Sequence, residues 1–510
     1  MRTTAWILGD QLTYQHPALA ELSTGDVVLM VESAGRAEAR PWHKQKLAFI
    51  WSAMRHFAQK LRDKGVGVDY HKLPSSPVDL RDTLRAHLRK YQPDRLLLME
   101  TAEFGRAAAL ASLARDIGVK TTVLDNTMFL SSREAFAREA KGKTSLVMEH
   151  FYRDMRRKTG LLMAQGEPEG GRWNFDAENR ESPPDSHEFP EIPRFEPDEA
   201  TRDVMALVED RFPDHFGKLE TFAWPVTHRD ARRFLRDFLD HRLDCFGPHE
   251  DAMVRDARAL CHSLLSPLLN VGLLEPLDVC QQAASRYWDG LARLNSVEGF
   301  IRQILGWREF IYQIYHLKMP GYSDANFFEV DLPLPSFYWD GETEMTCVAR
   351  AVGTVRGYGI NHHIQRLMIT GNFALIAGIN PQAVNDWYLT AYVDAYEWVV
   401  TPNVLGLALY ADGGMVATKP YAASANYINR MSDYCRSCRY RHRETTGETA
   451  CPFNALYWDF LARNEERLRA STPRMNLMLA MLGRRSSDEI AEIRARAGRI
   501  RDRLDQSASL

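Results

Sequence analysis

The chain has 510 residues, with 45% hydrophobic and 26% charged side chains, which is ordinary usage for a globular protein. Because one hydrophobic core rarely serves so long a chain, we expect two or three domains. The net charge of −3 excludes a general attraction to nucleic acid. No apolar run approaches the roughly 20 residues of a membrane span, so we expect no membrane contact.

Seven cysteines, without a secretory apolar segment after Met1, predict a reducing, cytoplasmic location and argue against disulfides. Cys245, Cys261 and Cys280 fall in segments with helical character. We expect these three to be buried small hydrophobic residues.

Residues 1–135 predict an α/β domain, because short apolar runs alternate with amphipathic helical stretches such as Lys44–Lys64. This alternation predicts a Rossmann-like, doubly wound parallel sheet whose ligands bind outside the carboxyl ends of the strands. No Gly-x-Gly-x-x-Gly motif is present, so a conventional dinucleotide site is not predicted. The expected strands are Thr4–Leu8, Val27–Val31, Val66–Tyr70, Arg95–Met99 and Lys120–Leu124.

Residues 136–200 predict a connector between domains. It begins with the basic amphipathic segment Phe151–Thr159 and continues as a stretch rich in proline, glycine and glutamate to about Asp198, which predicts a long loop. Residues 201–510 have helical periodicity almost throughout, so we expect an all-α domain. Its last element is a charged helix over Ser487–Gln506.

Four cysteines have the spacing of a metal site: Cys347, the pair Cys435 and Cys438, and Cys451, which a proline follows. The thiolates of a Cys-x-x-Cys pair can bind one ion or cluster, and the distant cysteines close the site through the fold. Tetrahedral zinc and a [4Fe–4S] cluster both accept four cysteinates, so spacing alone leaves both open. Four unrelated buried cysteines are a third alternative.

Several longer motifs accompany these cysteines. They are Gly9-Asp-Gln-Leu12, Asn361-His-His-Ile-Gln-Arg366, Trp387-Tyr388, Asp394-Ala-Tyr-Glu-Trp-Val399, Pro402-Asn403 and Thr418–Met431. Together they resemble the iron–sulfur bacterial cryptochromes and (6-4) photolyases over nearly the whole chain. The resemblance implies the photolyase/cryptochrome fold, with an antenna-binding α/β domain joined by a long loop to a helical FAD domain. It also implies a [4Fe–4S] cluster on the four cysteines.

The resemblance places the FAD diphosphate at a segment where hydroxyls and free backbone N–H groups begin a helix. Ordinary helix capping is the simpler interpretation without it. The segment comprises His262, Ser263, Leu264, Leu265 and Ser266. A second flavin-facing helix offers Arg302, Gln303, Trp307 and Glu309, which spacing alone would make surface residues of a core helix.

His363 and Arg366 share one helical face, whereas His362 points about 100° away. The pattern by itself indicates a buried histidine beside a paired arginine. The resemblance assigns His363 to proton transfer at the DNA lesion and assigns Arg366 and Asp394 to the flavin. Histidine suits proton transfer because its charge changes near neutral pH.

Three positions depart from related patterns. Leu367 stands where the animal enzymes have a second histidine, so a two-histidine mechanism does not carry over intact. Tyr396 stands where more distant members have a second acid. Val400 replaces the asparagine that classical photolyases keep near flavin N5.

Trp339, Trp387 and Tyr388 match the family's route for electron hopping between flavin and surface, a role that suits their low ionisation energy. Plain core packing is the alternative. Tyr421 and Tyr427 match tyrosines that line the lesion site.

DNA contact is expected at basic groups with aromatic residues between them, although a solvated charged face is an equal alternative. One group surrounds the cysteine pair, and the other lies in the connector. The groups are Arg430, Arg436, Arg439, Arg441 and Arg443 with Tyr434 and Tyr440, and Arg153, Arg156, Arg157 and Lys158. A damaged dinucleotide would be flipped from the duplex to meet a buried flavin.

The resemblance further implies a 6,7-dimethyl-8-ribityllumazine antenna beside Asp10, Gln11 and Leu12 and the loop Glu32–Lys46. Within that loop, Arg36 replaces a glutamate of a close relative and Trp42 replaces a histidine.

The implied function is light-driven repair of (6-4) pyrimidine–pyrimidone photoproducts in UV-damaged DNA by electron transfer from reduced FAD. We expect a monomer without an obligate protein partner. Two alternatives remain from the sequence. One is a cryptochrome-type blue-light photoreceptor with the same cofactors, and the other is a zinc-stabilised flavin redox enzyme unrelated to light.

Overall fold

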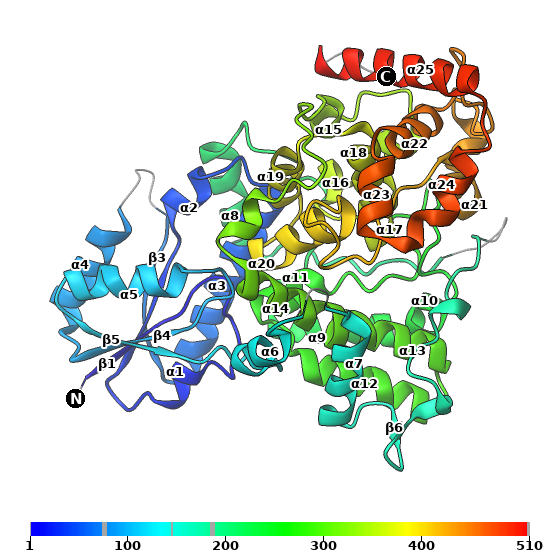
Figure 1. Cartoon of the computed structure of the whole chain (residues 1–510). Helices are drawn as coiled ribbons and strands as arrows, with labels where there is room; N and C mark the ends of the chain where they lie inside the picture. The colour runs from blue at the N-terminus through cyan, green and yellow to red at the C-terminus, as the bar shows by residue number, and fades with distance from the viewer. Residues whose placement is uncertain (1, 74–78, 144–145, 184–188, 507–510) are drawn as a thin grey trace.

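The computed structural model describes residues 2–73, 79–143, 146–183 and 189–506. It consists of an N-terminal α/β domain, at the left of Figure 1, and a larger helical part at the right. The predicted fold class is therefore confirmed. In the described residues, no helix is both long enough and apolar enough to cross a membrane.

A five-stranded sheet forms the centre of the α/β domain. All neighbouring strands are parallel, in the order β3-β2-β1-β4-β5, so the direction of winding reverses between β1 and β4. The strands are β1 (Thr3–Trp6), β2 (Val27–Val31), β3 (Gly67–His71), β4 (Arg95–Met99) and β5 (Lys120–Leu124). Each lies within two residues of its predicted position.

Alternate strand residues face opposite sides of this sheet, as the pleat requires. Ala5, Val28 and Leu97 face the large core that continues into the helical part. Trp6 and Leu29 face a second, smaller core closed by two helices of the α/β domain. The helices of this domain are α1 (Pro17–Ala20), α2 (Ala34–Glu38), α3 (Lys44–Asp63), α4 (Leu80–Tyr91), α5 (Arg106–Asp116) and α6 (Arg133–Ala140).

The connector is more structured than the sequence predicts. Its basic segment is the end of helix α7 (Met148–Thr159), and a short antiparallel hairpin follows, formed by β6 (Met163–Ala164) and β7 (Glu167–Pro168). The fully buried Arg156 donates hydrogen bonds to the carbonyls of Leu161, Leu162 and Trp173. These bonds hold the hairpin against α7, so the prediction that Arg156 contacts DNA is wrong.

Helices continue from α8 to the end of the described chain. They are α8 (Glu199–Arg211), α9 (His228–His241), α10 (Leu243–Phe246), α11 (Ser266–Val271), α12 (Pro276–Trp288), α13 (Leu294–Ile301), α14 (Glu309–Lys318), α15 (Phe337–Asp340), α16 (Thr346–Tyr358), α17 (His363–Gln365), α18 (Asn372–Ala377), α19 (Pro381–Ala391), α20 (Glu397–Thr401), α21 (Ala425–Met431), α22 (Pro452–Arg463), α23 (Glu465–Ser471), α24 (Asn476–Leu482) and α25 (Ser487–Asp505).

Helix α25 lies across the top of the helical part in Figure 1 and packs on α22. Asp459 of α22 is almost fully buried and is surrounded by the guanidinium groups of Arg463, Arg494 and Arg501. Ile493, Ala497 and Ile500 of α25 are buried. A buried carboxylate needs such partners, so these ion pairs fix where α25 docks.

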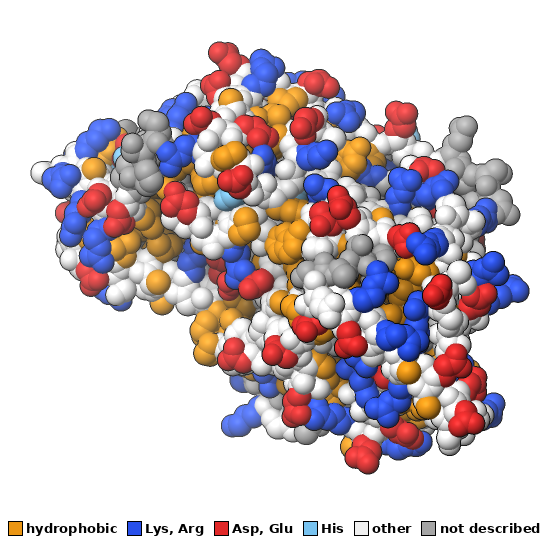
Figure 2. Space-filling model, turned by 90° about the horizontal axis from the view of Figure 1, so that it is seen from above, with side chains coloured by type: hydrophobic (Ala, Val, Ile, Leu, Met, Phe, Trp, Pro, Cys, Tyr) orange, Lys and Arg blue, Asp and Glu red, His pale blue; other side chains and the backbone are white. Residues whose placement is uncertain are grey.

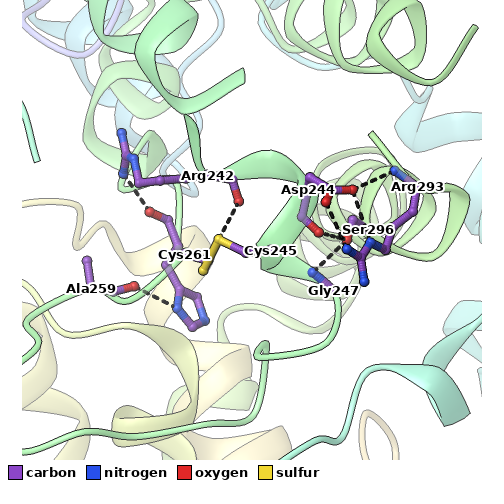
Figure 3. The surroundings of a disulfide bond; sticks show 9 residues. Arg242, Asp244, Cys245, Gly247, Ala259, Cys261, Arg293 and Ser296 are labelled. Carbon is purple, nitrogen blue, oxygen red and sulfur yellow. Dashed lines mark hydrogen bonds and ion pairs between the residues drawn. A yellow bond between two sulfur atoms is a disulfide. The ribbon is translucent and has the colours of Figure 1, made fainter. Parts of the chain in front are cut away.

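The prediction that the chain lacks disulfides is wrong, because Cys245 and Cys261 are joined, with their Cα atoms 5.7 Å apart. Figure 3 shows the disulfide with Arg242 beside it. Arg242 donates a hydrogen bond to the His262 carbonyl (2.8 Å), so the residue after Cys261 is held next to the start of α10. Cys280, by contrast, is a fully buried free cysteine, as predicted.

Candidate active site

An ion pair joins three of the segments predicted to bind the flavin. Two guanidinium nitrogens of Arg366 donate to the two carboxylate oxygens of Asp394, each at 3.0 Å. Ser266 donates to the same carboxylate at 2.6 Å, and Asn270 donates to the Asp394 carbonyl at 2.9 Å. Although burial alone would lower it, the pKa of Arg366 is raised by the Asp394 carboxylate. This bidentate pair fixes its side chains more firmly than a single bond would.

The loop that leads into α11 has an unusual backbone. Leu260 and Leu264 have φ angles of +46° and +57°, in the left-handed region that residues other than glycine rarely adopt. The Ser263 hydroxyl accepts a hydrogen bond from the Leu265 N–H at 3.4 Å. Conformations of this kind persist where the surrounding structure enforces them, and they gather at binding sites. The predicted His262–Ser266 segment is therefore a constrained turn beside Asp394.

His262 and His362 stack face to face beside this turn, with ring centroids 4.4 Å apart and planes inclined by 16°. Both rings are buried, and burial lowers the pKa of His262 to about 4 and that of His362 further. Nδ1 and Nε2 of His362 and Nε2 of His262 have no hydrogen-bond partner in the described residues. Buried polar atoms are normally paired, so these nitrogens fit a site for a polar ligand.

His363 begins α17, and its ring is exposed, whereas His362 precedes the helix and is buried. The two rings therefore lie in different environments because His362 has extended backbone and precedes the helix, not because both lie on one helix about 100° apart, as the sequence predicts. Surrounding protein atoms and the Arg366 charge lower the pKa of His363 to about 4.

Three π-helical segments occur among the described residues of the helical part: Arg302–Arg308, Arg366–Gly371 and Pro402–Ala408. The first holds predicted flavin residues, the second begins at Arg366, and the third follows Val400. Such interruptions of α-helices are often found at functional sites. Nothing in the sequence pattern predicts them.

The predicted residues of the second flavin helix lie in two different places: Arg302 and Gln303 contact acidic side chains, and Glu309 lies at the boundary with the α/β domain. Arg302 contacts Asp176 and Glu298 at 3.3 Å, and Gln303 donates to Glu250 at 2.9 Å. Glu309 accepts hydrogen bonds from the backbone and hydroxyl of Ser131 at the boundary with the α/β domain. Glu309 also pairs with Arg308, and Trp307 packs edge-on against Phe310.

The Glu309 carboxylate therefore ties the helical part to the chain that follows the sheet. In the described residues, Glu309 accepts hydrogen bonds from Leu130, Ser131 and Arg308 and from neither residue of the Arg366–Asp394 pair. This placement gives Glu309 a structural role at the domain boundary.

A chain of aromatic rings runs from Arg366 toward the surface. The guanidinium of Arg366 lies 4.1 Å from the ring centroid of Tyr392, which is 5.3 Å from Tyr388 and 5.7 Å from Trp387. Trp387 is fully buried, lies 5.0 Å from Tyr338 and donates to the Tyr338 carbonyl at 2.7 Å. The next residue, Trp339, is 37% exposed.

Two of these rings, Tyr338 and Tyr392, were not among the predicted site residues. Tyr338 contacts Trp387 and directly precedes Trp339 in the chain, and Tyr392 contacts both Trp387 and Arg366. A signal was present, because Tyr392 is two residues from Asp394 and Tyr338 directly precedes Trp339. The Tyr392 ring contacts are local to the end of α19, whereas the Tyr338 contact depends on the packing of α15 against α19, which periodicity does not reveal.

Tyr421 and Tyr427 lie beside a group of acidic residues. Burial raises the pKa of both tyrosines, and so does the charge of Asp251, while Asp176 raises the pKa of Tyr421 alone. The Arg430 guanidinium lies 5.6 Å from the Tyr427 ring centroid. Burial raises the pKa of Asp251 to about 6 and that of its neighbour Glu250 to about 8. The connector thus reaches the segment that was predicted to line the lesion site.

The four predicted metal ligands come together although more than 80 residues separate Cys347 from the others along the chain. Cys347, Cys435, Cys438 and Cys451 line one cavity, with Tyr434 and Tyr440 among the other lining residues. Burial and the neighbouring thiols raise the pKa of Cys347 far above its usual value and those of Cys435 and Cys451 to about 12. Ionisation of Cys347, Cys435 and Cys451 would therefore need a cationic centre nearby.

The donor set leaves both metal hypotheses open. Among the described residues, no group of three or more His, Cys, Asp or Glu side chains is arranged to hold one metal ion. Tetrahedral zinc and a [4Fe–4S] cluster both take four cysteine thiolates as ligands.

The aromatic residues of the basic groups are placed differently from prediction. Tyr434 and Tyr440 are buried under the cysteines, and the Tyr434 hydroxyl accepts a hydrogen bond from Gln365. These two rings therefore cannot meet DNA bases, and only the arginines around them reach the surface. On the face shown in Figure 2, Lys and Arg side chains are mixed with Asp and Glu.

The predicted antenna edge lies at the reversal point of the sheet. Gln11 follows β1 and donates to the carbonyls of Met99 and Glu100 after β4, while Asp10 lies 3.7 Å from Arg106. The Leu12 N–H donates to the Val271 carbonyl of the helical part at 2.7 Å. The carboxyl edge at such a point is the usual ligand site of these sheets.

A cavity of about 430 Å³ is lined by residues from α2, the loop before α3, the turn before α5 and the segment that begins α20, among them Arg36, Trp42, Glu103 and Tyr396. The buried Tyr396 hydroxyl has no partner in the described residues. Two aromatic rings, an unpaired hydroxyl and charged side chains suit a small aromatic ligand that carries polar groups.

Comparisons with known proteins agree with this arrangement. A family model described as deoxyribodipyrimidine photo-lyase-related protein matches residues 5–224. A (6-4) photolyase of Agrobacterium fabrum is 48% identical over 505 residues, which are 98% of this chain and 99% of that protein. The uncharacterised protein R855 of Acanthamoeba polyphaga mimivirus is 33% identical over 102 residues, or 20% of this chain and 76% of that protein.

A solved structure also matches over the full length. It is the crystal structure of a bacterial class III photolyase from Agrobacterium tumefaciens, which covers 99% of this chain and 96% of its own at 15% identity, with a TM-score of 0.58. At this identity the match shows the fold. Because the identity to the Agrobacterium fabrum protein extends over both domains, the chain belongs to the iron–sulfur bacterial cryptochrome and (6-4) photolyase family.

Proposed function

We propose that this protein is a light-driven (6-4) DNA photolyase, a lyase that restores pyrimidine–pyrimidone photoproducts by transient electron transfer from a reduced flavin. The full-length similarity to a protein of that name carries the proposal. The arrangement around Arg366 and Asp394 supports it, because a polar site with unpaired buried nitrogens, an exposed histidine and a chain of aromatic rings meet there.

FAD would be held by the turn at His262–Ser266 and by the Arg366–Asp394 pair, with His262 and His362 beside it. When bound, FAD supplies the excited-state electron transfer that side chains cannot supply. Ser266 and Arg366 orient the ligand because Asp394 already fixes their side chains. The aromatic chain through Trp387 offers electrons a path between the surface and this site.

His363 would hold or deliver the proton at the lesion. Its ring is exposed and lies one turn before Arg366, so a flipped dinucleotide could meet both the flavin side and the imidazole. The anionic DNA backbone would raise the pKa of His363 from its low value in the free protein. Tyr421 and Tyr427 would form the opposite wall.

The four cysteines would hold a [4Fe–4S] cluster that stabilises the fold, since the repair cycle requires no redox change there. The cavity at Arg36 and Tyr396 would hold a lumazine antenna. We expect the protein to act in the cytoplasm, as a monomer without an obligate protein partner.

Illumination of the reduced protein with a damaged oligonucleotide tests the proposal. Protein reduced and lit with near-UV or blue light should restore an oligonucleotide that contains one (6-4) photoproduct. It should leave a matched oligonucleotide with a cyclobutane dimer largely unchanged. Chromatography of the products measures both. Absence of repair by flavin-loaded, reduced protein would favour a photoreceptor instead.

A further inference from the structure

A polar cavity of about 540 Å³ opens beside the four cysteines, and no role assigned above uses it. Three guanidinium groups line it: Arg255 from the segment before α11, Arg350 from α16 and Arg439 from the cysteine loop. The hydroxyls of Thr346 and Ser437 complete its polar wall. We call this feature the arginine cavity.

The positive charge of the arginine cavity is only partly balanced. Arg439 pairs with Glu344, the acidic residue of the lining. Arg255 donates to Ser437 at 2.8 Å, and its Nε lies 3.5 Å from Asp256 without a hydrogen bond. Arg350 is exposed and has no ion pair with any described residue. The cavity therefore has an excess of positive charge.

The donors in this cavity suit a phosphate group. A guanidinium offers two parallel N–H groups that match phosphate oxygens, and hydroxyls add further donors. Helix α16 also begins here at Thr346, and no side chain caps its first N–H groups. The positive end of that helix adds to the attraction that the arginines already provide.

The position of the cavity indicates which phosphate it receives. Arg255 is four residues from Asp251, which lies beside Tyr427 on the proposed lesion side. Four residues span at most about 14 Å, and one DNA strand carries a charge every ~3.4 Å along its axis. The Arg255 backbone N–H is bound to Asp433, so the segment is fixed next to the cysteine loop. A strand whose lesion is flipped toward Tyr427 would carry its flanking phosphates to this cavity.

We propose that the arginine cavity is a binding site for a backbone phosphate of DNA that flanks the lesion, an inference that rests on the proposed function. The site shares α16 with Cys347 and the loop 433–439 with Cys435 and Cys438. The cysteine centre therefore shapes a phosphate site as well as the fold. This gives a chain with a net charge of −3 a local surface for DNA.

Dark binding of DNA to flavin-loaded protein tests the proposal. Anisotropy of a labelled duplex, with and without one (6-4) photoproduct, would be measured over a range of salt concentrations. Arg350→Gln should weaken binding of both duplexes by a similar factor, about tenfold, and reduce the salt slope by about 0.9. At DNA concentrations below saturation, the repair yield should fall by the same factor as the affinity.

Matched variants separate this effect from general charge and folding. Arg89→Gln removes the charge of an exposed arginine on α4 of the α/β domain and should change neither affinity nor slope. Arg350→Lys keeps the charge and should restore the slope, though not the full affinity. Iron content and visible absorption verify that each variant retains its cluster.

Two results would overturn the proposal. One is an Arg350→Gln protein with wild-type affinity and wild-type salt slope. The other is that inorganic phosphate raises the melting temperature of the wild type but not that of Arg350→Gln, while both proteins bind DNA equally well. That result would assign the cavity to free phosphate. Failure of the wild type to repair DNA would count against the proposed function alone, because binding of the undamaged duplex does not depend on repair.

Discussion

At the residue scale, His363 is distinguished from its neighbour by exposure. We predict that His363→Ala retains FAD and DNA binding but loses most of its repair yield, because the lesion radical would return its electron before it is protonated. General acid assistance is commonly worth about 10²–10⁴ in rate, enough to decide that competition. Repair yield per absorbed photon at saturating DNA is the measurement.

His362→Ala is the matched control for this experiment. It removes a ring that stacks on His262, so it should lower flavin retention or thermal stability and hurt repair less once flavin is saturated. Normal repair by His363→Ala would remove this histidine from the mechanism.

Glu250 makes stability depend on pH. Burial raises its pKa from 4.5 to about 8 in the folded protein, so between these values the folded state holds a proton that the unfolded chain releases. The free energy of unfolding should therefore fall as pH rises through this window. Glu250→Gln should remove this pH-dependent change in the free energy of unfolding, which is on the order of 3–4 kcal/mol. Asp251 should leave a smaller pH dependence of the same sign.

Denaturant unfolding of the flavin-free protein at pH 5 and pH 8.5 measures this effect. The Gln303 and Asn179 side chains donate to Glu250, and a glutamine can still accept one such bond. An identical pH dependence in wild type and Glu250→Gln would show that other groups control it.

At the element scale, the packing of α15 against α19 builds the aromatic chain. We predict that Trp387→Phe slows photoreduction of oxidised FAD by external donors, because phenylalanine is harder to ionise and the bond to the Tyr338 carbonyl is lost. Repair by chemically reduced protein should persist. Flavin absorbance under illumination follows the first process, and oligonucleotide repair follows the second.

Trp224→Phe is the matched control, because Trp224 is also buried and donates to a side chain, Gln45, but lies outside the chain of rings. It should photoreduce normally. Loss of both activities in a folded Trp387→Phe protein would indicate a role other than electron transfer.

At the scale of the whole molecule, the four cysteines join α16, the 433–439 loop and the start of α22. We predict that purified protein carries about four iron atoms per chain and a broad absorption beneath the flavin bands. Cys438→Ser should yield insoluble or flavin-poor protein, because losing a ligand removes binding free energy that contributes to folding. Iron analysis and visible spectra measure both.

Cys280→Ala provides the control, since it removes a buried thiol that lies outside the four-cysteine cavity. It should keep its iron and flavin. Zinc in place of iron in the wild type would overturn the cluster assignment.

The sequence by itself determined the two-part architecture and the class of chemistry. Short apolar runs that alternate with helical stretches located all five strands of the sheet. The signal is strongest at the inner strands β2 and β4, because burial on both faces favours continuous hydrophobic residues, and the edge strands β3 and β5 are only partly buried. The spacing of the cysteines and the motif around His363 and Arg366 singled out ligand and site candidates. These are local patterns, so they can be recognised without the fold.

Only the tertiary structure decided which candidates meet. It brought Cys347 to the other three cysteines, joined Cys245 to Cys261 and committed Glu309 to Ser131 at the domain boundary. It also buried Arg156 and Tyr434, which their sequence context had made surface candidates. The physical reason is that burial and contact depend on how distant segments pack, whereas charge and periodicity describe only each segment's own surface.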